Sequence, residues 1–404
     1  MKKMGLREFL FLVPILILIC IFSLWPVLQS FTYSFFDYQL NDRTKSGLYL
    51  SERFNVDLYN ETSFYVDRFI SMDMETISDD QDKADANQVL AGLTELNKEF
   101  ENEEGVIKLT GDQTDQVLNV YQNTKTTVDQ LVSKYELQQG ENLPLLVDDI
   151  NNSLIQSNFV GLDGYKQAFS DGFVGIALKN TLIFTVVSVF LELILGMGMA
   201  LIMNKAMQGQ GFIRTSSLIP WAIPTAVAAL MWSYLYDGGA GIVAEFFSIV
   251  GFIDQPTDLL QTSTGAMTAV VLADVWKTTP YMAILLLAGL QTIPKSLYEA
   301  ASIDGASIVQ KFFRVTVPLL MPAILVALLF RTMDAFRVFD LIYVLTGGGP
   351  GGSTETLSVY SYKVMFGQTN FGYGSVIVMI MFVCVAIITT IYVKVLGASV
   401  MEKN

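Results

Sequence analysis

The sequence predicts an all-α, polytopic membrane protein with six transmembrane helices and one helical insertion outside the membrane. The chain has 404 residues, of which 52% are hydrophobic. Six of its segments reach or approach the ~20 mostly apolar residues that cross a bilayer as a helix. The formal net charge is nevertheless −14, and the segment Gln39–Asn158 holds 23 acidic and 9 basic residues, which accounts for all of it. The chain therefore combines an apolar body with one acidic, water-soluble insertion.

The first apolar stretch covers roughly Phe9–Phe36 and follows three basic residues, Lys2, Lys3 and Arg7. Basic residues ahead of an apolar stretch also mark secretory signal peptides. This stretch is too long for a signal peptide, and no small-residue cleavage site follows it. We therefore predict a retained transmembrane helix that forms a first domain, residues 1–38.

The second domain is the acidic insertion, residues 39–157, and its middle part has the pattern of helices. Apolar residues recur there at steps of three and four, which is the spacing of one helix face. Glu104-Gly105 and Gly111-Asp112 separate two such runs, and Asp112 is a candidate N-cap. We predict an antiparallel helical hairpin with further short helices near residues 60–72 and 145–155. The periodic residues are Val89, Leu90, Leu93, Leu96, Phe100, Val117, Leu118, Tyr121, Val128, Leu131, Val132 and Tyr135.

The third domain, residues 158–404, holds the other five spans. Short loops rich in Lys and Arg stay in the cytoplasm. If six spans alternate, the basic residues at both termini and in the loops after the second and fourth spans fall on one side, and the insertion falls on the other. We predict cytoplasmic N- and C-termini and an extracellular insertion. The five spans are roughly Leu178–Met207, Arg214–Tyr236, Ala266–Leu290, Pro318–Leu345 and Tyr373–Leu396.

The loop at residues 295–317, between the fourth and fifth spans, has the composition of a protein contact. Glu299 offers a carboxylate, and the adjacent Ala300 and Ala301 allow another protein to approach closely. Asp304 and Gly305 follow, and Gly305 lets the chain turn sharply. We predict that this loop docks on a cytoplasmic partner.

This pattern continues through Phe312, Phe313, Pro318 and Pro322. It resembles the Glu-Ala-Ala loop of permease subunits in binding-protein-dependent (type I) ABC importers. In that family the loop forms a coupling helix that docks on the ATP-hydrolysing subunit. The resemblance therefore implies that Glu299, Ala300, Ala301, Asp304 and Gly305 couple the chain to an ATPase.

Four other segments resemble the carbohydrate branch of these permeases, and in particular the larger maltose-type subunit. The resemblance is loose over residues 1–36 and close over residues 159–404. The maltose-type subunit also carries an extracellular domain just before its second core span. The present insertion is shorter and acidic and does not match that domain. The four segments are Phe159–Tyr165, Asn180-Thr181, Pro220–Pro224 and Thr346–Pro350.

The resemblance also implies a location and a set of partners. The expected location is the plasma or inner membrane of a prokaryotic cell, in contact with lipid. The expected partners are a second homologous permease, two ATPase subunits, an extracellular solute-binding protein and a carbohydrate. The acidic insertion disfavours nucleic acid, and the absence of His excludes histidine catalysis and histidine metal ligation.

The sequence predicts a transport subunit without its own ATPase site or cofactor. The segment Gly347–Thr354 is rich in glycine but lacks the Lys of a phosphate-binding loop. No other stretch offers a nucleotide loop, so we expect ATP to be bound by the partner ATPases.

Ionisable residues in the fourth and fifth spans mark a candidate substrate pathway, because such groups at membrane depth usually face a bundle interior or water. Carboxylates and cations bond sugar hydroxyls, and aromatic rings stack on sugar faces. The same charges are also what intramembrane salt bridges would need, so both interpretations stay open. Arg331 adds a further charge, and Glu192 in the second span has no evident partner. The candidate pathway residues are Asp274, Trp276, Lys277, Thr278, Tyr281, Asp334, Arg337, Phe339 and Asp340.

Other functions remain as alternatives to an oligosaccharide importer. A permease for glycerophosphodiesters or other phosphate esters would favour extra unpaired cations at membrane depth. An ion-driven secondary transporter would show an inverted repeat, and none is visible. A sensory or scaffold membrane protein would act through the insertion, which is either a docking surface for the solute receptor or a solvated spacer.

Overall fold

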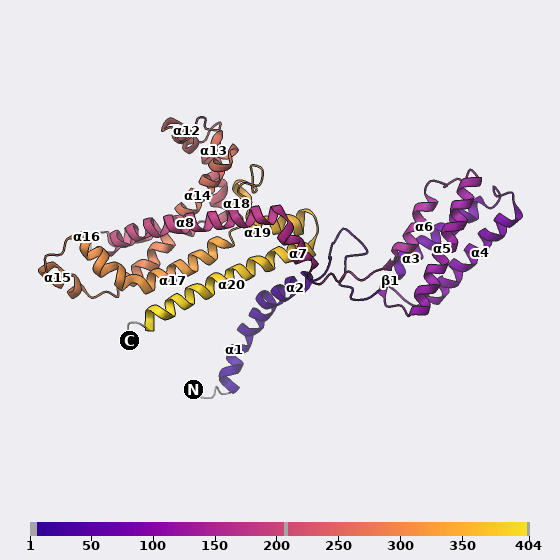
Figure 1. The fold of residues 1–404 in the computed structure, drawn as a ribbon, viewed down its shortest axis with the longest axis horizontal. Coiled ribbons are helices and arrows are strands. Elements are labelled where there is room, and N and C mark those ends of the chain that lie inside the picture. The colour runs from indigo at the N-terminus through magenta and orange to yellow at the C-terminus, as the bar shows by residue number, and fades with distance from the viewer. Residues whose placement is uncertain (1–5, 206–208, 402–404) are drawn as a thin grey trace. The chain divides into compact units, whose positions relative to one another are not determined.

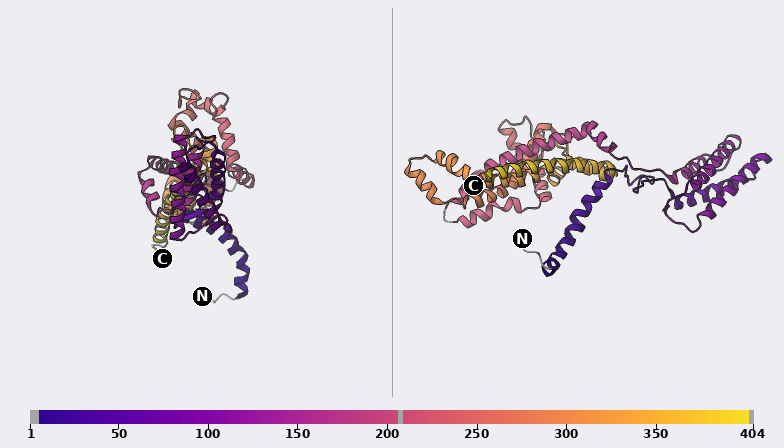
Figure 2. Two further views of the ribbon diagram at one scale, coloured as in Figure 1. Left: turned by 90° about the vertical axis from the view of Figure 1, so that its right-hand side faces the viewer. Right: turned by 60° about the horizontal axis from the view of Figure 1, so that its bottom comes forward.

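The computed structural model describes residues 6–205 and 209–401, and nearly all of its regular structure is helical. Contacts divide the chain into two units. We call them the membrane unit (Met1–Ser34, Leu162–Gln368 and Tyr373–Asn404) and the insertion unit (Phe35–Gly161 and Thr369–Gly372). Figures 1 and 2 show the helices of both. The all-α class predicted from the sequence is confirmed.

Five helical stretches in the described part of the chain are long and apolar enough to cross a membrane, and a bent pair makes a sixth candidate. The first stretch runs through α1 (Leu6–Ile19), the π-helical turn Cys20–Leu24 and α2 (Trp25–Tyr33). The others are α8 (Gly172–Asn204), α14 (Ser263–Leu290), Ile308–Phe336 with α16 (Ile308–Lys311) and α17 (Val317–Phe336), and α20 (Phe371–Met401). Polytopic architecture is therefore confirmed, while the sidedness of the termini stays a prediction.

The third predicted span, Arg214–Tyr236, is not one continuous helix. Helices α9 (Gln210–Ser217) and α10 (Ile219–Ala222) meet α11 (Thr225–Leu235) at an angle of 87°. Pro224 lacks an N–H, and a proline also holds the residue before it in an extended conformation. Ile223 accordingly has φ −70° and ψ 133°. Pro224 thus ends α10 and starts α11 in a new direction.

The fifth predicted span, Pro318–Leu345, is also broken. Helix α17 ends at Phe336, and α18 (Asp340–Leu345) begins after three residues of irregular backbone, Arg337–Phe339. Irregular backbone at membrane depth is tolerated where protein satisfies its polar groups. The Val338 carbonyl accepts hydrogen bonds from the hydroxyls of Thr356 and Ser358. The apolar count of the sequence could not show this interruption.

Helix α14 is the centre of the membrane unit. It packs against α8, α17, α10, α11 and α18. Small residues allow the closest approaches, as is usual between transmembrane helices. A Cβ atom at Gly196 of α8 would lie 2.8 Å from Met282 of α14, and one at Gly289 of α14 would lie 2.4 Å from Ala323 of α17. Helix α17 also contacts α20, where the Thr332 and Tyr392 hydroxyls lie 3.1 Å apart.

Shorter elements connect the spans of the membrane unit. They are α7 (Asp163–Ser170), α12 (Ile242–Ile249), α13 (Asp258–Gln261), α15 (Lys295–Ile303), the π-helical turn Phe312–Thr316, α19 (Leu357–Tyr362) and the π-helical turn Lys363–Gly367.

The insertion unit is a four-helix bundle with a small sheet (Figure 1). The predicted hairpin corresponds to α4 (Asp80–Glu99) and α5 (Gly111–Lys134), and the predicted flanking helices to α3 (Val56–Asp73) and α6 (Leu143–Asn152). The sheet, which was not predicted, has the antiparallel order β2-β1-β3. Its strands are β1 (Arg53–Asn55), β2 (Val106–Ile107) and β3 (Leu154–Ile155).

The N-cap predicted at Asp112 is wrong. The cap of α5 is Thr110, whose hydroxyl accepts from the Gln113 N–H at 3.4 Å. The Gln113 side chain accepts from the Thr110 N–H at 3.1 Å. This reciprocal capping box satisfies two backbone donors at the helix start, so α5 begins two residues earlier than a cap at Asp112 would place it.

Candidate functional site

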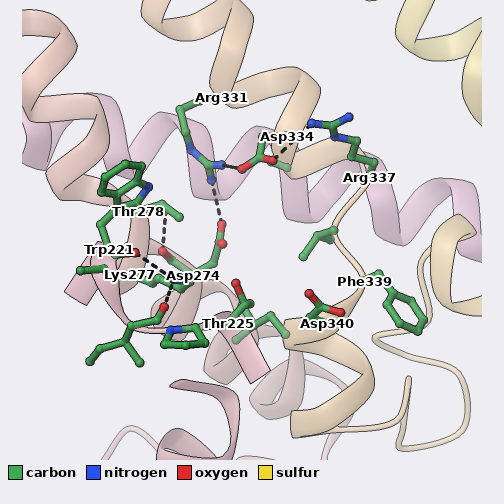
Figure 3. A pocket seen from close by; sticks show the side chains of 16 residues that line it. Trp221, Thr225, Asp274, Lys277, Thr278, Arg331, Asp334, Arg337, Phe339 and Asp340 are labelled. Carbon is green, nitrogen blue, oxygen red and sulfur yellow. Dashed lines mark hydrogen bonds and ion pairs between the residues drawn. The ribbon is translucent and has the colours of Figure 1, made fainter. Parts of the chain in front are cut away.

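A cavity of about 530 Å³ lies where the two broken spans meet α14 (Figure 3). Four elements contribute to its wall: the break between α10 and α11, the middle of α14, the end of α17, and the irregular segment before α18. Each break places backbone and polar side chains where a continuous helix would present only apolar ones. The lining residues that carry polar, charged or aromatic side chains are Trp221, Thr225, Asp274, Lys277, Thr278, Arg331, Asp334, Arg337, Phe339 and Asp340.

Arg331 is the centre of the ionic network at the base of this cavity. Its side chain is 1% exposed, and it grips Glu192 of α8 through two hydrogen bonds, Nε to Oε2 at 2.5 Å and Nη2 to Oε1 at 2.7 Å. Nη2 also donates to Asp274 of α14 at 3.1 Å, and Nη1 donates to Asp334 at 2.7 Å. The hydroxyl of Thr278 lies 2.7 Å from Glu192 Oε1. One guanidinium thus ties α8, α14 and α17 together.

Glu192, which had no evident partner in the sequence, is therefore the main partner of Arg331. The two residues stand 139 positions apart. The available signal was that Glu192 is the only carboxylate inside its apolar span, and such groups usually pair with an opposite charge. Arg331 was noted as a charge in the fifth span but was not among the predicted pathway residues.

Lys277 was predicted as a pathway residue, and the structure turns its ammonium toward backbone. Nζ donates to the carbonyl oxygen of Ile223 at 2.6 Å and to that of Trp221 at 3.3 Å (Figure 3). These carbonyls stand at the C-terminal end of α10, where the intrahelical donors stop. A cation there also complements the negative end of the helix dipole. Lys277 therefore supplies hydrogen-bond donors to the carbonyls at the break in the third span.

The open side of the cavity carries three charged side chains from the predicted set. Asp334 and Arg337 have side chains 60% and 66% exposed, and their charged atoms are 3.8 Å apart. Asp340 is exposed at the start of α18, and no ion pair to it occurs among the residues that the structure describes. The cavity thus has a closed ionic base and an open rim with free hydrogen-bonding capacity.

The predicted aromatic residues divide between the cavity and the packing around it. Phe339 lines the cavity and stacks on Tyr343 with ring centroids 5.1 Å apart. Tyr281 stacks on the cavity residue Trp221 at 5.6 Å without lining the cavity itself. Trp276 packs edge-on against Trp232 at 5.5 Å and also lies outside the lining. The structure therefore gathers Asp274, Lys277, Thr278, Asp334, Arg337, Phe339 and Asp340 at one cavity.

The loop with the Glu-Ala-Ala pattern forms a second exposed feature. Helix α15 ends at Ile303, and Gly305 has φ +76°, a left-handed conformation that favours glycine. The Ala306 N–H donates to the Ala301 carbonyl at 2.9 Å, which closes the helix end. Glu299, Ala300 and Asp304 are exposed, and Ala301 is half-buried.

The same loop displays apolar side chains that nothing in the described chain covers. Ile303 and Ile308 are 87% and 85% exposed, and Val309 and Phe313 are each 64% exposed. Ser307 fixes the turn between them, because it caps α16 in a capping box with Gln310. These four side chains form an apolar knob, flanked by the exposed carboxylates of Glu299 and Asp304. An exposed apolar patch of this kind is typical of a docking site for another protein.

Comparisons with known proteins agree with these features. Residues 192–401 match the family described as "Binding-protein-dependent transport system inner membrane component". The trehalose/maltose transport system permease protein MalF of Thermococcus litoralis is 47% identical over 237 residues, covering 59% of this chain and 79% of that protein. The trehalose transport system permease protein SugA of Mycobacterium tuberculosis is 44% identical over 241 residues, covering 60% and 76%.

Other relatives have different named substrates. The sn-glycerol-3-phosphate transport system permease protein UgpA of Yersinia pestis is 34% identical over 262 residues, covering 63% of this chain and 87% of that protein. A bacterial ABC transporter that imports the acidic polysaccharide alginate superposes with a TM-score of 0.53 at 22% identity, covering 59% and 84%. That level of identity supports the fold alone.

Proposed function

The chain belongs to the family of binding-protein-dependent transport system inner membrane components, and from this premise we propose that it forms the substrate pathway of an ATP-driven sugar importer. Apolar helices suited to crossing a membrane agree with an inner-membrane component of a bacterium or archaeon. The observation that carries the proposal is the cavity where the two broken spans meet α14. The similar permeases named for trehalose and maltose support an oligosaccharide as its substrate.

The cavity rim has the chemistry that a sugar needs. Asp334 and Asp340 can accept hydrogen bonds from hydroxyl groups, and Arg337 can donate to hydroxyl oxygens. Trp221 and Phe339 supply aromatic faces beside these groups. Pockets that bind small molecules combine apolar walls with a few placed polar groups in this way. By contrast, Arg331 and Lys277 are already committed to protein partners, so a sugar contacts chiefly the rim.

The exposed knob of α15 and α16 supplies the proposed link to ATP. Its flanking carboxylate Glu299 and its uncovered apolar residues suit docking on a separate ATPase. We propose a complex with a second homologous permease, two ATPase subunits and an extracellular solute-binding protein. Nucleotide-driven motion of the docked loops would then shift the helices between inward- and outward-open packings. ATP chemistry belongs to the partners, and the chain itself acts as a transport subunit.

The double variant Asp334→Asn with Arg337→Gln tests whether the rim binds sugar. Asn at position 334 keeps an amide oxygen that can accept the hydrogen bond from Arg331 Nη1, and the exposed ion pair with Arg337 contributes only about 0–1 kcal/mol, so the double change should leave the fold stable. We expect uptake of trehalose or maltose by the reconstituted transporter to fall at least about tenfold, the effect of losing one or two hydrogen bonds, while basal ATPase activity survives. Glu245→Gln, in an exposed outer helix, is the control. Uptake by the double variant at the wild-type rate would exclude these two residues as sugar ligands.

The same reconstituted transporter separates the alternatives. Uptake of glycerophosphodiesters in place of disaccharides would favour a phosphate-ester importer. Purification of the chain without any ATPase would favour a sensory or scaffold protein.

A further inference from the structure

We propose that Glu192 is a positioning and specificity-determining residue that adapts the cavity to neutral sugars and excludes anionic ones. This role rests on the proposed function, since it concerns the choice of substrate at the same cavity. Glu192 is 0% exposed and does not line the cavity. It therefore acts through Arg331, which does line it.

Carboxylates occupy most of the hydrogen-bond donors of Arg331. A guanidinium has five N–H groups, and four hydrogen bonds run from Arg331 to carboxylates. Glu192 takes two of these in a bidentate grip, which is the strongest geometry for this pair. An arginine held in this way has little left to offer a carboxylate, phosphate or sulfonate on a substrate.

Glu192 also sets the formal charge at the cavity. Among the described residues, the cavity is lined by three carboxylates (Asp274, Asp334 and Asp340) and three cations (Lys277, Arg331 and Arg337). Those six charges cancel, and Glu192 directly behind Arg331 adds one further negative charge. An anionic substrate therefore meets a net negative site. The binding of a neutral sugar does not depend on this net charge, and the sugar can form hydrogen bonds with the rim groups.

A buried carboxylate is a costly residue at this position if its only role is to hold helices together. Burying an ion pair between helices costs desolvation that the pairing only partly offsets, and two apolar residues would often be as stable. A structural tie between α8 and α17 would also be served by such a pair. The two roles differ in their consequences. Loss of a tie weakens binding of every substrate, whereas loss of a charge changes the preference between substrates of different charge.

The experiment measures that preference directly. The assembled transporter in detergent, without the solute-binding protein, is titrated with trehalose and with its monocarboxylate, in which one hydroxymethyl group is oxidised. Quenching of tryptophan fluorescence reports binding, since Trp221 lines the cavity. We expect Glu192→Gln to raise the affinity ratio of carboxylate to neutral sugar by roughly tenfold or more, as expected for removing one charge at close range in a protein interior.

Four further variants make the result specific. Glu192→Asp keeps the charge and should keep the wild-type ratio. Glu192→Gln with Arg331→Gln restores the net charge and should return the ratio toward wild type. Arg331→Gln alone makes the site more negative and should lower the ratio, and it tests the idea even if Glu192→Gln does not assemble. Glu355→Gln removes a carboxylate that pairs with Lys363 at 2.8 Å outside the cavity, and it should leave the ratio unchanged.

The outcomes distinguish this inference from the proposed function. If both sugars bind to Glu192→Gln and Arg331→Gln with the wild-type ratio, the specificity role of Glu192 is overturned and the sugar pathway stands. If wild-type transporter binds no neutral disaccharide, the proposed function itself fails.

Discussion

Lys277 of α14 donates a hydrogen bond of 2.6 Å to the carbonyl oxygen of Ile223, at the point where the third span breaks. Because the bend at Pro224 ends α10, the last carbonyls before it lack the backbone N–H donors that a continuous helix would supply. The Lys277 ammonium donates to them instead. A residue that sequence reasoning assigned to substrate thus has a structural partner, and its substitution should affect the bend before it affects sugar.

Lys277→Met should lower the thermal stability of the transporter. The change removes two charge-assisted hydrogen bonds to part-buried carbonyls, which costs about 1–3 kcal/mol. Lys277→Arg keeps a cation and should retain part of the stability. Thermal unfolding in detergent measures both. If Lys277→Met instead keeps its stability and loses affinity for sugar, Lys277 is a substrate ligand.

Gly305→Val should uncouple ATP hydrolysis from transport. A left-handed φ costs a residue with a Cβ roughly 1–2 kcal/mol, and at Gly305 that strain would deform the turn after α15. We expect receptor-stimulated ATPase activity to fall while membrane insertion stays normal. Gly251→Val is the matched control, because Gly251 has φ +79° and, like Gly305, no neighbour within 4 Å of an added Cβ.

Glu299→Lys tests the same docking surface through its charge. The exposed carboxylate on α15 should face a polar or cationic site on the ATPase. If charge reversal leaves both complex assembly and stimulation intact, Glu299 takes no part in the contact.

Deletion of residues 50–156 should remove the helical insertion and leave the membrane unit folded. The ends of that segment lie together, because the Asn158 N–H donates to the Tyr49 carbonyl at 3.1 Å and the Tyr49 N–H donates to Asn158 Oδ1 at 2.9 Å. We expect the shortened chain to assemble with its partners and to bind the solute receptor more weakly, with a salt-dependent difference. Equal receptor affinity at low salt would identify the insertion as a spacer.

Acid should loosen the insertion unit through Asp82. This buried carboxylate accepts from Lys134 Nζ at 3.0 Å, from the Tyr135 hydroxyl at 2.9 Å and from Gln130 Nε2 at 2.8 Å. The hydrogen bond from Lys134 holds the pKa of Asp82 below its ordinary value. Its contribution to stability is therefore complete above the unfolded-state pKa of about 3.9 and is lost as the pH falls below it.

Hydrogen exchange can measure this effect in the full-length protein. At neutral pH, Asp82→Asn should reduce protection in α4 and α5 relative to α20. The wild type should lose the same protection only below about pH 4. Asp85→Asn, on the same helix, neutralises a carboxylate whose hydrogen bond from the exposed Gln81 side chain an amide oxygen can still accept, and it should change protection little. Equal protection in Asp82→Asn and wild type would show that the network does not stabilise the bundle.

Local sequence was sufficient wherever a property depends on neighbouring residues. The apolar lengths predicted five long helical stretches and a sixth candidate that is bent, because crossing a bilayer depends on a continuous stretch. The three- and four-residue periodicity predicted α4 and α5, because it defines one helix face. The turn at Gly305 was also predictable, since a left-handed residue after a helix favours glycine.

The sequence did not show where two of the spans are interrupted. Pro224 was a visible signal for the first break, yet the apolar pattern around it suggested one helix. The second break, at Arg337–Phe339, depends on hydroxyls from Thr356 and Ser358 that reach the Val338 carbonyl. Those donors stand about twenty residues downstream, so no local pattern records them.

The sequence by itself determined the membrane class, the helical insertion, the exposed loop after α14 and the span positions of most cavity charges. Tertiary structure decided which of those charges bind each other. Glu192 meets Arg331 only because α8 packs beside α17, and Lys277 meets Ile223 only because the third span folds across α14. The physical reason is that hydrophobic length acts along the chain, whereas an ion pair requires two side chains to meet in space.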